Sequence, residues 1–487
     1  MQIKDLISSD VVLAAGDENA RVAGITADSR AVEKGMIFAA LAGSKADGRR
    51  FIADAIAKGA SGVMTGPDGV GAVPAGVAVL AAAEPRRALA QTAARLYPGQ
   101  PKHVVAVTGT NGKTSVADFT RQVFAALGRK SASLGTIGVV KPDGAIYGSL
   151  TTPDPVTLHK MLAGLAGEGI THLAMEASSH GLDQYRLDGV QLAAGAFLNL
   201  GRDHLDYHPD ISHYLAAKLG LFTRLLQPGQ PAIVNADAPF AEDAIAAAKA
   251  RGLGVLTVGT KGNTLRLTGI VRDGFEQVAT IAAANTTHTV RLKLIGDYQA
   301  GNALAAAAFA IALGEDVAAS IRALEHLKGV AGRLEVIGDR HGGIAVVDYA
   351  HKPEALAAAL AALRPFATGR LVTVVGCGGN RDAGKRPIMG RIAAEQSDSV
   401  IVTDDNPRHE DPASIRRAIM EGVPTGLTSR VREIGDRADA INAAVRQMGP
   451  GDVVLVAGKG HETGQIVGDL TIPFSDQAQV RAALATA

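Results

Sequence analysis

A short glycine-containing segment between a strand and a helix constrains the fold of this chain more than any other feature. Residues 104–108 form the apolar run V-V-A-V-T, the sequence continues G-T-N-G-K-T to residue 114, and a helix is predicted over residues 115–127. In this order, backbone N–H groups at the start of the helix can surround phosphate oxygens. Such loops follow buried strands of parallel sheets, so the sequence predicts an α/β fold that binds a nucleoside triphosphate.

Lys113 and Thr114 carry the chemistry of this loop. The lysine can neutralise the β- and γ-phosphates, and the threonine hydroxyl can hold Mg²⁺. The loop departs from the general pattern G-x-x-x-x-G-K-[ST], because Val107 stands where the first glycine would be. Motors, GTPases, kinases and ligases share such loops, so the loop predicts triphosphate binding without defining the reaction.

The strand-like runs of the chain fall into three blocks. With 487 residues, the chain is too long for one ordinary core. The first block ends at the linker 98–101, whose two prolines and glycine cannot continue a helix. We therefore predict three α/β domains, comprising residues 1–100, residues 101–330 with a mostly parallel sheet, and residues 331–487 with a Rossmann-like parallel pattern.

Composition argues against several classes of protein. The formal net charge is +1 and basic residues are scattered, whereas a nucleic-acid-binding surface usually has a dense basic patch. The single cysteine, Cys377, cannot form an intramolecular disulfide. We find no signal peptide and no apolar run of about 18 residues, so we expect no membrane insertion.

Polar residues follow the predicted strands of the central block. Glu176 ends the run 172–176, where it could bind the same Mg²⁺ as Thr114 or remain a surface glutamate. The segment N-L-G-R-D-H-L-D-Y-H over 199–208 predicts either a polar site or a hydrogen-bonded loop. On the following predicted helix, Tyr214 and Lys218 share one face, a place where a lysine is ordinarily solvated.

Taken together, these motifs resemble the Mur ligases, in the order in which that family has them. The matching segments are T-G-T-N-G-K-T at 108–114, T-T-P at 151–153, E-A-S-S-H at 176–180, D-H-L-D-Y-H at 203–208, Y-L-A-A-K at 214–218, G-R-L-E at 332–335, D-Y-A-H-K-P at 348–353, D-N-P-R at 405–408 and G-K-G-H-E at 458–462. The D-N-P-R tetrapeptide resembles that of the branch of the family that adds meso-diaminopimelate to UDP-N-acetylmuramoyl-L-alanyl-D-glutamate.

The resemblance implies an ATP-dependent ligase of cytoplasmic peptidoglycan precursor synthesis. Its N-terminal domain would bind the uridine nucleotide, its central domain ATP and its C-terminal domain the amino acid. ATP would activate the D-glutamyl side-chain carboxylate as an acyl phosphate, which the amine of diaminopimelate attacks, with release of ADP and phosphate. We expect small-molecule substrates, no nucleic-acid partner and a monomer.

The resemblance also implies the catalytic and metal-binding residues. Lys113, Glu176, His204 and Lys218 match catalytic positions of the family. Thr114 and Glu176 would hold one Mg²⁺, and His204 and Lys218 a second. The lysine matching Lys218 is carbamylated by CO₂ in the family, which turns a cation into an anionic oxygen ligand and requires the neutral amine.

Further positions match substrate contacts of the family. The ATP contacts would be Gly109, Thr110, Asn111, Gly112, Lys113, Thr114, Ser115, Asn302, Arg333 and Asp348. The UDP-linked substrate would contact Ala27, Ser29, Ser44, Lys45, Ala46, Thr151, Thr152, Ser178, Gln184 and Arg186. Leu150 stands where family members often have asparagine, which puts one polar contact to this substrate in doubt.

The amino-acid pocket would contain Arg381, Asp405, Asn406, Pro407, Arg408, Gly458 and Glu462. Diaminopimelate differs from lysine by a carboxylate on the far carbon, which a guanidinium can bind in bidentate fashion. Lysine would leave Arg408 without this counter-charge, at a cost of about 2–3 kcal/mol or more.

Other readings of the sequence stay open at this point. They are a lysine-adding Mur ligase, a folylpolyglutamate synthetase, a phosphate-loop switch or nucleic-acid motor, and a non-catalytic UDP-sugar-binding protein. Arg408 and the UDP-type N-terminal block argue against the first two. The near-neutral charge argues against a motor, and a protein that only binds a UDP-sugar would not need Lys113, Thr114, Glu176 and Lys218 together.

Overall fold

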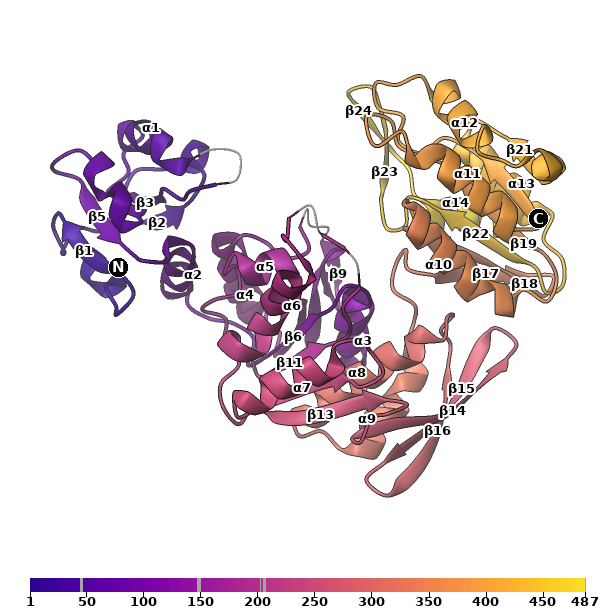
Figure 1. The fold of residues 1–487 in the computed structure, drawn as a ribbon, viewed down its shortest axis with the longest axis horizontal. Helices are drawn as coiled ribbons and strands as arrows, with labels where there is room; N and C mark the ends of the chain where they lie inside the picture. Colours follow the sequence, from indigo (N-terminus) through magenta and orange to yellow (C-terminus); the bar gives the residue numbers. More distant parts are fainter. Residues whose placement is uncertain (44–46, 147–149, 202, 205–206, 487) are drawn as a thin grey trace. The chain divides into compact units, whose positions relative to one another are not determined.

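The computed structural model of the protein describes residues 1–43, 47–146, 150–201, 203–204 and 207–486 (Figure 1). The chain divides into two compact units. The first contains residues 1–266 and 304–321, and the second contains residues 267–303 and 322–487. Among the described residues, no helix is both long enough and apolar enough to cross a membrane.

A five-stranded sheet begins the first unit. Its strand order is β1-β5-β4-β3-β2, and only β1 runs antiparallel to its neighbour. Both faces are covered, since Ile37 packs in a cluster with Leu89 of α2 and Phe38 packs in a cluster with Ala55 of α1. The elements are β1 (Val12–Ala15), β2 (Gly24–Thr26), β3 (Met36–Ala39), α1 (Ile52–Ala57), β4 (Gly62–Thr65), β5 (Ala78–Ala81) and α2 (Pro85–Leu96).

The main sheet of the first unit has β6 at its centre, between β10 and β11. Its parallel part has the order β13-β12-β11-β6-β10-β7, and β8 and β9 extend it as antiparallel strands. The strands are β6 (His103–Thr108), β7 (Ser131–Gly135), β8 (Gly138–Lys141), β9 (Gly144–Ile146), β10 (His172–Glu176), β11 (Ala194–Phe197), β12 (Pro231–Asn235) and β13 (Gly254–Gly259). The helices are α3 (Lys113–Ala126), α4 (Pro155–Gly167), α5 (Ser179–Asp183), α6 (Ile211–Gly220) and α7 (Ala241–Ala250).

This topology brings three functional segments together. The carboxyl ends of parallel strands meet at one edge of a sheet, where α/β proteins bind their ligands. The phosphate loop after β6, Glu176 at the end of β10 and the polar loop after β11 therefore share that edge. The helix predicted over 115–127 is α3, and the strand predicted over 172–176 has the bounds of β10.

The second unit contains a six-stranded sheet with helices on both faces. The strand order is β17-β18-β22-β19-β20-β21, and β17 is antiparallel to β18 while the other pairs are parallel. Leu360 of α10, Met389 of α11 and Ile415 of α12 belong to one core cluster, while Ile441 of α13 and Val480 of α14 belong to another. The elements are β17 (Glu335–Arg340), β18 (Gly343–Asp348), α10 (Pro353–Leu363), β19 (Leu371–Val375), α11 (Lys385–Gln396), β20 (Ser399–Val402), α12 (Pro412–Met420), β21 (Val431–Glu433), α13 (Arg437–Arg446), β22 (Val453–Ala457) and α14 (Asp476–Ala485).

Antiparallel hairpins complete the second unit. The strands β23 (Gly464–Val467) and β24 (Leu470–Pro473) form a two-stranded sheet directly after β22. β15 (Glu276–Ala283) pairs with β16 (Thr286–Leu292), and β14 (Leu265–Asp273) borders β15. Two further helices, α8 (Tyr298–Ala312) and α9 (Val317–Arg322), lie at the points where the chain passes between the units.

Candidate functional site

The phosphate loop is held by contacts within itself. Gly112 has φ +87°, a left-handed conformation that glycine adopts without steric cost, and it precedes the first turn of α3. The Lys113 ammonium donates to the backbone oxygens of Gly109 at 2.8 Å and Thr110 at 2.9 Å. The strand, turn and helix predicted around Lys113 are therefore present, and its charge lies over the loop.

Lys218 lies against the same loop and is buried. Its side chain is on α6, the residue is 1% exposed, and its Nζ donates to the Gly109 oxygen at 2.8 Å. The same Nζ lies 4.5 Å from the ring centroid of Tyr214, whose hydroxyl is 3.1 Å from Thr110 Oγ1. Burial, together with the charge of Lys113, lowers the pKa of Lys218 to about 6. The amine is therefore largely uncharged at neutral pH.

Asn199 fixes the phosphate loop from the neighbouring strand end. Its side-chain oxygen accepts from the Asn111 N–H at 2.9 Å, and its side-chain nitrogen donates to the Asn111 oxygen at 3.1 Å. Its backbone oxygen accepts from the Thr110 N–H at 3.1 Å. Sequence reasoning noted this residue only as the start of a polar segment. An asparagine directly after a buried strand, at the edge that carries the phosphate loop, was the available signal.

Glu176 is buried at the end of β10 and belongs to a network of hydroxyl groups. Its Oε1 accepts from the Thr136 N–H at 2.7 Å, and its Oε2 accepts from the Thr136 hydroxyl at 3.3 Å. Thr136 Oγ1 is in turn 3.0 Å from Thr151 Oγ1. The glutamate is 1% exposed, so it is not the surface residue that the sequence left open. Thr136 was missed, because no motif contains it.

His204 lies among aromatic rings near the phosphate loop. Its φ is +53°, and its ring centroid is 4.9 Å from that of His180 and 6.1 Å from that of Tyr214. The neighbouring His208 is buried, and this burial lowers its pKa to about 4. In the described part of the chain, no three His, Cys, Asp or Glu side chains form a metal-binding group. The predicted Mg²⁺ ligands also include a threonine hydroxyl and a modified lysine, which are not among these four residue types. The two Mg²⁺ sites therefore stay predictions.

Four of the residues predicted to bind the UDP-linked substrate form one cluster. The Arg186 guanidinium donates to the Thr152 oxygen at 2.8 Å and to Gln184 Oε1 at 2.7 Å. The Thr152 hydroxyl donates to the Glu176 backbone oxygen and accepts from the Ser178 N–H. This cluster therefore connects directly to the strand end that carries Glu176. Leu150 is 51% exposed.

The predicted contacts in the N-terminal sheet lie in loops after its strands. Ala27 follows β2, and Ser29 begins a short 3₁₀ turn in which its backbone oxygen accepts from Lys58 Nζ at 2.9 Å. The predicted contacts Ser44, Lys45 and Ala46 lie outside the described residues.

The three predicted nucleotide contacts of the second unit each have neighbours within the protein. The Asp348 carboxylate accepts from the N–H groups of Leu334 at 2.7 Å and Ala350 at 2.8 Å, and burial raises its pKa. The Arg333 guanidinium lies 5.0 Å from the ring centroid of Tyr349. Asn302 is buried and donates to Gln299 Oε1 at 2.9 Å.

The predicted amino-acid pocket has a buried lysine at its base. Asn406 Nδ2 donates to Glu462 Oε2 at 2.9 Å, and Lys459 Nζ donates to Asn406 Oδ1 at 2.8 Å. Lys459 is fully buried and lies 3.2 Å from Asp405 Oδ1, a buried oxygen that has no hydrogen-bond partner among the described residues. Because Gly458 has φ +120° and a Cβ there would lie 2.9 Å from Asp405 Oδ2, only glycine fits comfortably. Sequence reasoning named Gly458 and Glu462 but missed Lys459.

Arg408 has a left-handed backbone conformation beside this cluster. Its φ is +53°, and its Nη1 donates to the Gly379 oxygen at 2.9 Å. Gly379 approaches so closely that an added Cβ would lie 2.0 Å from the Pro407 oxygen. Arg381 follows in the same loop and is exposed. The structure thus gathers Asp405, Asn406, Pro407, Arg408, Gly458 and Glu462, whereas the Arg381 side chain makes no hydrogen bond or ion pair to them among the described residues.

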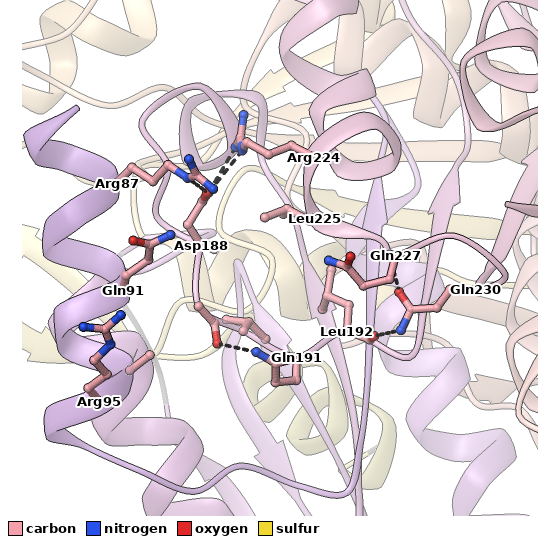
Figure 2. Close-up of a pocket in the computed structure, with 13 residues that line it drawn as sticks. Arg87, Gln91, Arg95, Asp188, Gln191, Leu192, Arg224, Leu225, Gln227 and Gln230 are labelled. Carbon is pink, nitrogen blue, oxygen red and sulfur yellow. Dashed lines mark hydrogen bonds and ion pairs between the residues drawn. The ribbon is translucent and has the colours of Figure 1, made fainter. Parts of the chain in front are cut away.

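A polar cavity of about 350 Å³ lies elsewhere in the first unit, beside α2 (Figure 2). Asp188 is 3% exposed and accepts from Arg87 of α2 at 3.2 Å and from Arg224 at 3.3 Å. Figure 2 shows both arginines pointing at this carboxylate, and Gln230 donating to the Leu192 oxygen. The residues predicted for catalysis and substrate binding are not among those that line the cavity. Arg87 and Asp188 instead tie α2 to the loop before β11.

Comparison with protein families assigns every block of the chain to one group. The Mur ligase middle domain matches residues 107–310, the glutamate ligase domain of the Mur ligases matches residues 332–460, and the Mur ligase family catalytic domain matches residues 21–97. The three-domain α/β architecture predicted from the sequence is therefore confirmed, whereas the boundaries at residues 100 and 330 stay predictions.

Relatives that bear one name match the chain over nearly its full length. A UDP-N-acetylmuramoyl-L-alanyl-D-glutamate–2,6-diaminopimelate ligase of Bradyrhizobium diazoefficiens is 54% identical, covering 100% of this chain and 99% of the relative. The protein of that name from Rhizobium meliloti is 55% identical over 95% of this chain and 94% of its own length. A solved structure of a ligase with this name is 31% identical, with a TM-score of 0.74 over 100% of this chain and 99% of that one. A folylpolyglutamate synthase of Mycobacterium tuberculosis shares the fold over only 77% of this chain, with 20% identity and a TM-score of 0.60.

Proposed function

This chain belongs to the Mur ligase family, and we propose that it joins meso-diaminopimelate to UDP-N-acetylmuramoyl-L-alanyl-D-glutamate at the expense of ATP. The reaction forms an amide bond in the synthesis of a peptidoglycan precursor. The observation that carries the proposal is the 54% identity to a ligase of this name over the whole chain. This chain contains the D-N-P-R segment and the phosphate loop.

ATP binds through the loop after β6. Backbone N–H groups at the start of α3 receive the phosphates, and Lys113 neutralises their charge. Its ammonium already lies over the loop through its bonds to Gly109 and Thr110. Asn302, Arg333 and Asp348 are the proposed contacts of the nucleotide in the second unit.

The residues around the phosphate loop fit two Mg²⁺ ions. Thr114 and Glu176 would hold one, because a buried carboxylate and a hydroxyl are the hard oxygen ligands that Mg²⁺ prefers. His204 and Lys218 would hold the other, with Lys218 carrying a carbamate formed from CO₂. The buried, largely uncharged amine of Lys218 supports this modification, since only a neutral amine attacks CO₂. When bound, the ions offset negative charge on the phosphoryl group in transfer.

The chemistry proceeds in two displacements. A carboxylate oxygen of the D-glutamyl side chain attacks the γ-phosphorus of ATP, ADP leaves, and an acyl phosphate forms. The uncharged amine of diaminopimelate then attacks the acyl carbon, phosphate leaves, and the nitrogen loses a proton. Arg186, whose guanidinium donates to Thr152 and Gln184, is the proposed contact for an anionic part of the UDP-linked substrate, together with Thr151 and Ser178.

The segment 405–408 selects the acceptor. Arg408 binds the far carboxylate of diaminopimelate, which lysine lacks. The carboxylates of Asp405 and Glu462 accept from the ammonium group that diaminopimelate carries beside this carboxylate. Arg381 and Gly458 complete this set as proposed contacts.

The remaining assignments follow from the family. Ala27, Ser29 and residues 44–46 are proposed contacts of the UDP group. We further propose that the enzyme is a cytoplasmic monomer whose partners are its small-molecule substrates rather than nucleic acid.

Phosphate release from ATP tests the proposed function. The assay contains UDP-N-acetylmuramoyl-L-alanyl-D-glutamate, Mg²⁺ and bicarbonate, and it compares meso-diaminopimelate with L-lysine as acceptor. Turnover with diaminopimelate alone is expected. Equal turnover with lysine would contradict the role of Arg408, and no turnover with either acceptor would contradict the ligase activity itself.

A further inference from the structure

Lys459 is a buried cation that the proposed mechanism does not use. It is the second residue after β22, lies between two glycines with positive φ, and is 0% exposed. Its ammonium donates to Asn406 Oδ1 at 2.8 Å and to the Gly464 oxygen at 2.9 Å. It also lies 3.2 Å from Asp405 Oδ1 and 3.6 Å from Glu462 Oε2. A buried charge is costly unless it is fully surrounded by partners, so four oxygens around one ammonium indicate a specific role.

One consequence of these contacts is a fixed orientation of the Asn406 amide. An ammonium group donates hydrogen bonds and cannot accept them, so the amide oxygen must face Lys459. The same oxygen also accepts from the Ile466 N–H at 2.9 Å. With the oxygen held by two donors, the amide nitrogen is directed at Glu462, to which it donates at 2.9 Å.

A second consequence concerns the backbone of Arg408. Its left-handed φ of +53° is unfavourable for a residue with a side chain, so neighbouring contacts must hold it. The hairpin β23–β24 supplies them, because the Arg408 N–H donates to the Ile466 oxygen at 3.0 Å and the Gly468 N–H donates to the Arg408 oxygen at 2.7 Å. Lys459 binds the first residue of this hairpin, Gly464, and thereby ties the hairpin to Asn406.

We propose that Lys459 is a positioning residue for acceptor selection. It fixes the positions of Asn406, Glu462 and the hairpin that holds Arg408, and it does not itself touch the amino acid. This inference rests on the proposed function, because it takes Asn406, Arg408 and Glu462 as the acceptor-binding set. Lys459 is too deeply buried to reach a ligand, and its contacts join the segment 405–408 to the segment 458–466.

The test is steady-state ligation by the full-length Lys459→Met variant. Methionine keeps the length and apolar character of the side chain and removes only the ammonium. The KM for diaminopimelate is expected to rise by about tenfold or more, while the KM values for ATP and the UDP-linked substrate stay within about twofold. The preference for diaminopimelate over lysine should fall as well, because Arg408 is no longer held.

Arg370→Met is the matched control for a purely structural effect. Arg370 pairs with the buried Asp452 at 2.6 Å, at the opposite end of β22 from Lys459. Its loss should lower Tm without a selective rise in the KM for the acceptor. If Lys459→Met also lowers Tm while all three KM values change equally, Lys459 has no positioning role.

A second variant keeps the inference testable where Lys459→Met does not fold. Ile466→Pro deletes the other donor to Asn406 Oδ1 and leaves the lysine in place. A rise of several-fold in the KM for diaminopimelate is expected, and an unchanged value would overturn the inference. Wild-type turnover separates the two hypotheses. Its absence refutes the ligase, whereas normal wild-type turnover, with variants in which the three KM values change equally, refutes only the role of Lys459.

Discussion

The Nζ atoms of Lys113 and Lys218 both donate to the backbone oxygen of Gly109, each at 2.8 Å. Two positive charges at one carbonyl would repel each other, and Lys218 is buried. Burial and this repulsion lower the pKa of Lys218 from its ordinary value of 10.5 to about 6. The phosphate loop therefore carries one charged lysine and one lysine that is mostly uncharged at neutral pH.

We predict that Lys218 binds CO₂ at neutral pH. In ¹³CO₂-equilibrated buffer at pH 7.5, the wild-type protein should show a ¹³C carbamate resonance, because the neutral amine is abundant above its lowered pKa. Lys218→Arg should lack the resonance and the ligase activity, since a guanidinium does not lose its proton. A carbamate signal of equal intensity in the variant would assign it to another amine.

The same pKa predicts that Lys218 reduces stability. At pH 7 the amine binds a proton in the unfolded chain but mostly not in the native protein, so this residue favours unfolding. The cost is largest below about pH 6 and declines as the pH rises towards 10.5. In CO₂-free buffer, Lys218→Met should raise Tm at pH 7 and abolish ligation, and the gain in Tm should shrink towards pH 10. A lower Tm of the variant at pH 7 would show that the amine is not destabilising.

Gly135 is predicted to control the position of Glu176. A Cβ at residue 135 would lie 2.1 Å from Glu176 Oε1, so Gly135→Ala must displace the carboxylate. The kcat/KM of ligation should fall by about tenfold or more, and the Mg²⁺ concentration for half-maximal rate should rise. Gly164→Ala, in the interior of α4 where an added Cβ meets nothing within 4 Å, is the control and should retain full activity.

The sequence predicted the parts of this site that depend on local order. The local order of strand, glycine turn and helix determines that Lys113 lies at the start of the helix. In the same way, the apolar run before Glu176 determines that this residue lies at a strand end. The (i, i+4) spacing of Tyr214 and Lys218 on α6 gives the contact of 4.5 Å between ammonium and ring. Each of these arrangements is defined within about twenty residues of chain.

The residues that sequence reasoning missed have partners far along the chain. Lys459 meets Asn406 across 53 positions, and Thr136 meets Glu176 across 40. Asp188 pairs with Arg87 across 101 positions. Such contacts exist only after the sheets have formed, and single sequences carry no signal for them. The burial of Lys218 was likewise unexpected from spacing alone, and only the family resemblance favoured it.

Asp188 is predicted to stabilise the junction between α2 and the central sheet (Figure 2). Asp188→Asn removes the negative charge that Arg87 and Arg224 share. It should lower the free energy of unfolding by about 1–3 kcal/mol. The loss is limited because Arg87 is 40% exposed and partly screened by solvent. Urea unfolding measures this loss. Asp10→Asn is the control, because Asp10 also contacts Arg87 but is 42% exposed, and its effect should stay below about 0.5 kcal/mol. Equal losses in both variants would contradict the importance of burial.

His172 is predicted to make the protein acid-sensitive. Burial, followed by the charge of His103, lowers its pKa from 6.5 to about 4. Between these values the unfolded chain binds a proton that the native protein excludes, so stability should fall as pH decreases from 6.5 to 4. His172→Phe preserves the ring packing on Phe124 and should flatten the dependence of Tm on pH in this range. The exposed His326, changed to Gln, should leave the wild-type dependence intact.

Arg408 is predicted to set the preference for diaminopimelate over lysine. Its guanidinium can bind the far carboxylate with two parallel hydrogen bonds, and an ammonium group cannot. Arg408→Lys should therefore reduce kcat/KM for diaminopimelate by about 30-fold or more, corresponding to the estimated 2–3 kcal/mol, while the low rate with L-lysine changes little. Arg417→Lys makes the same substitution at an exposed position of α12 and should preserve the preference. An unchanged ratio of the two kcat/KM values in Arg408→Lys would mean that another residue reads the carboxylate, and the exposed Arg381 would be the next candidate.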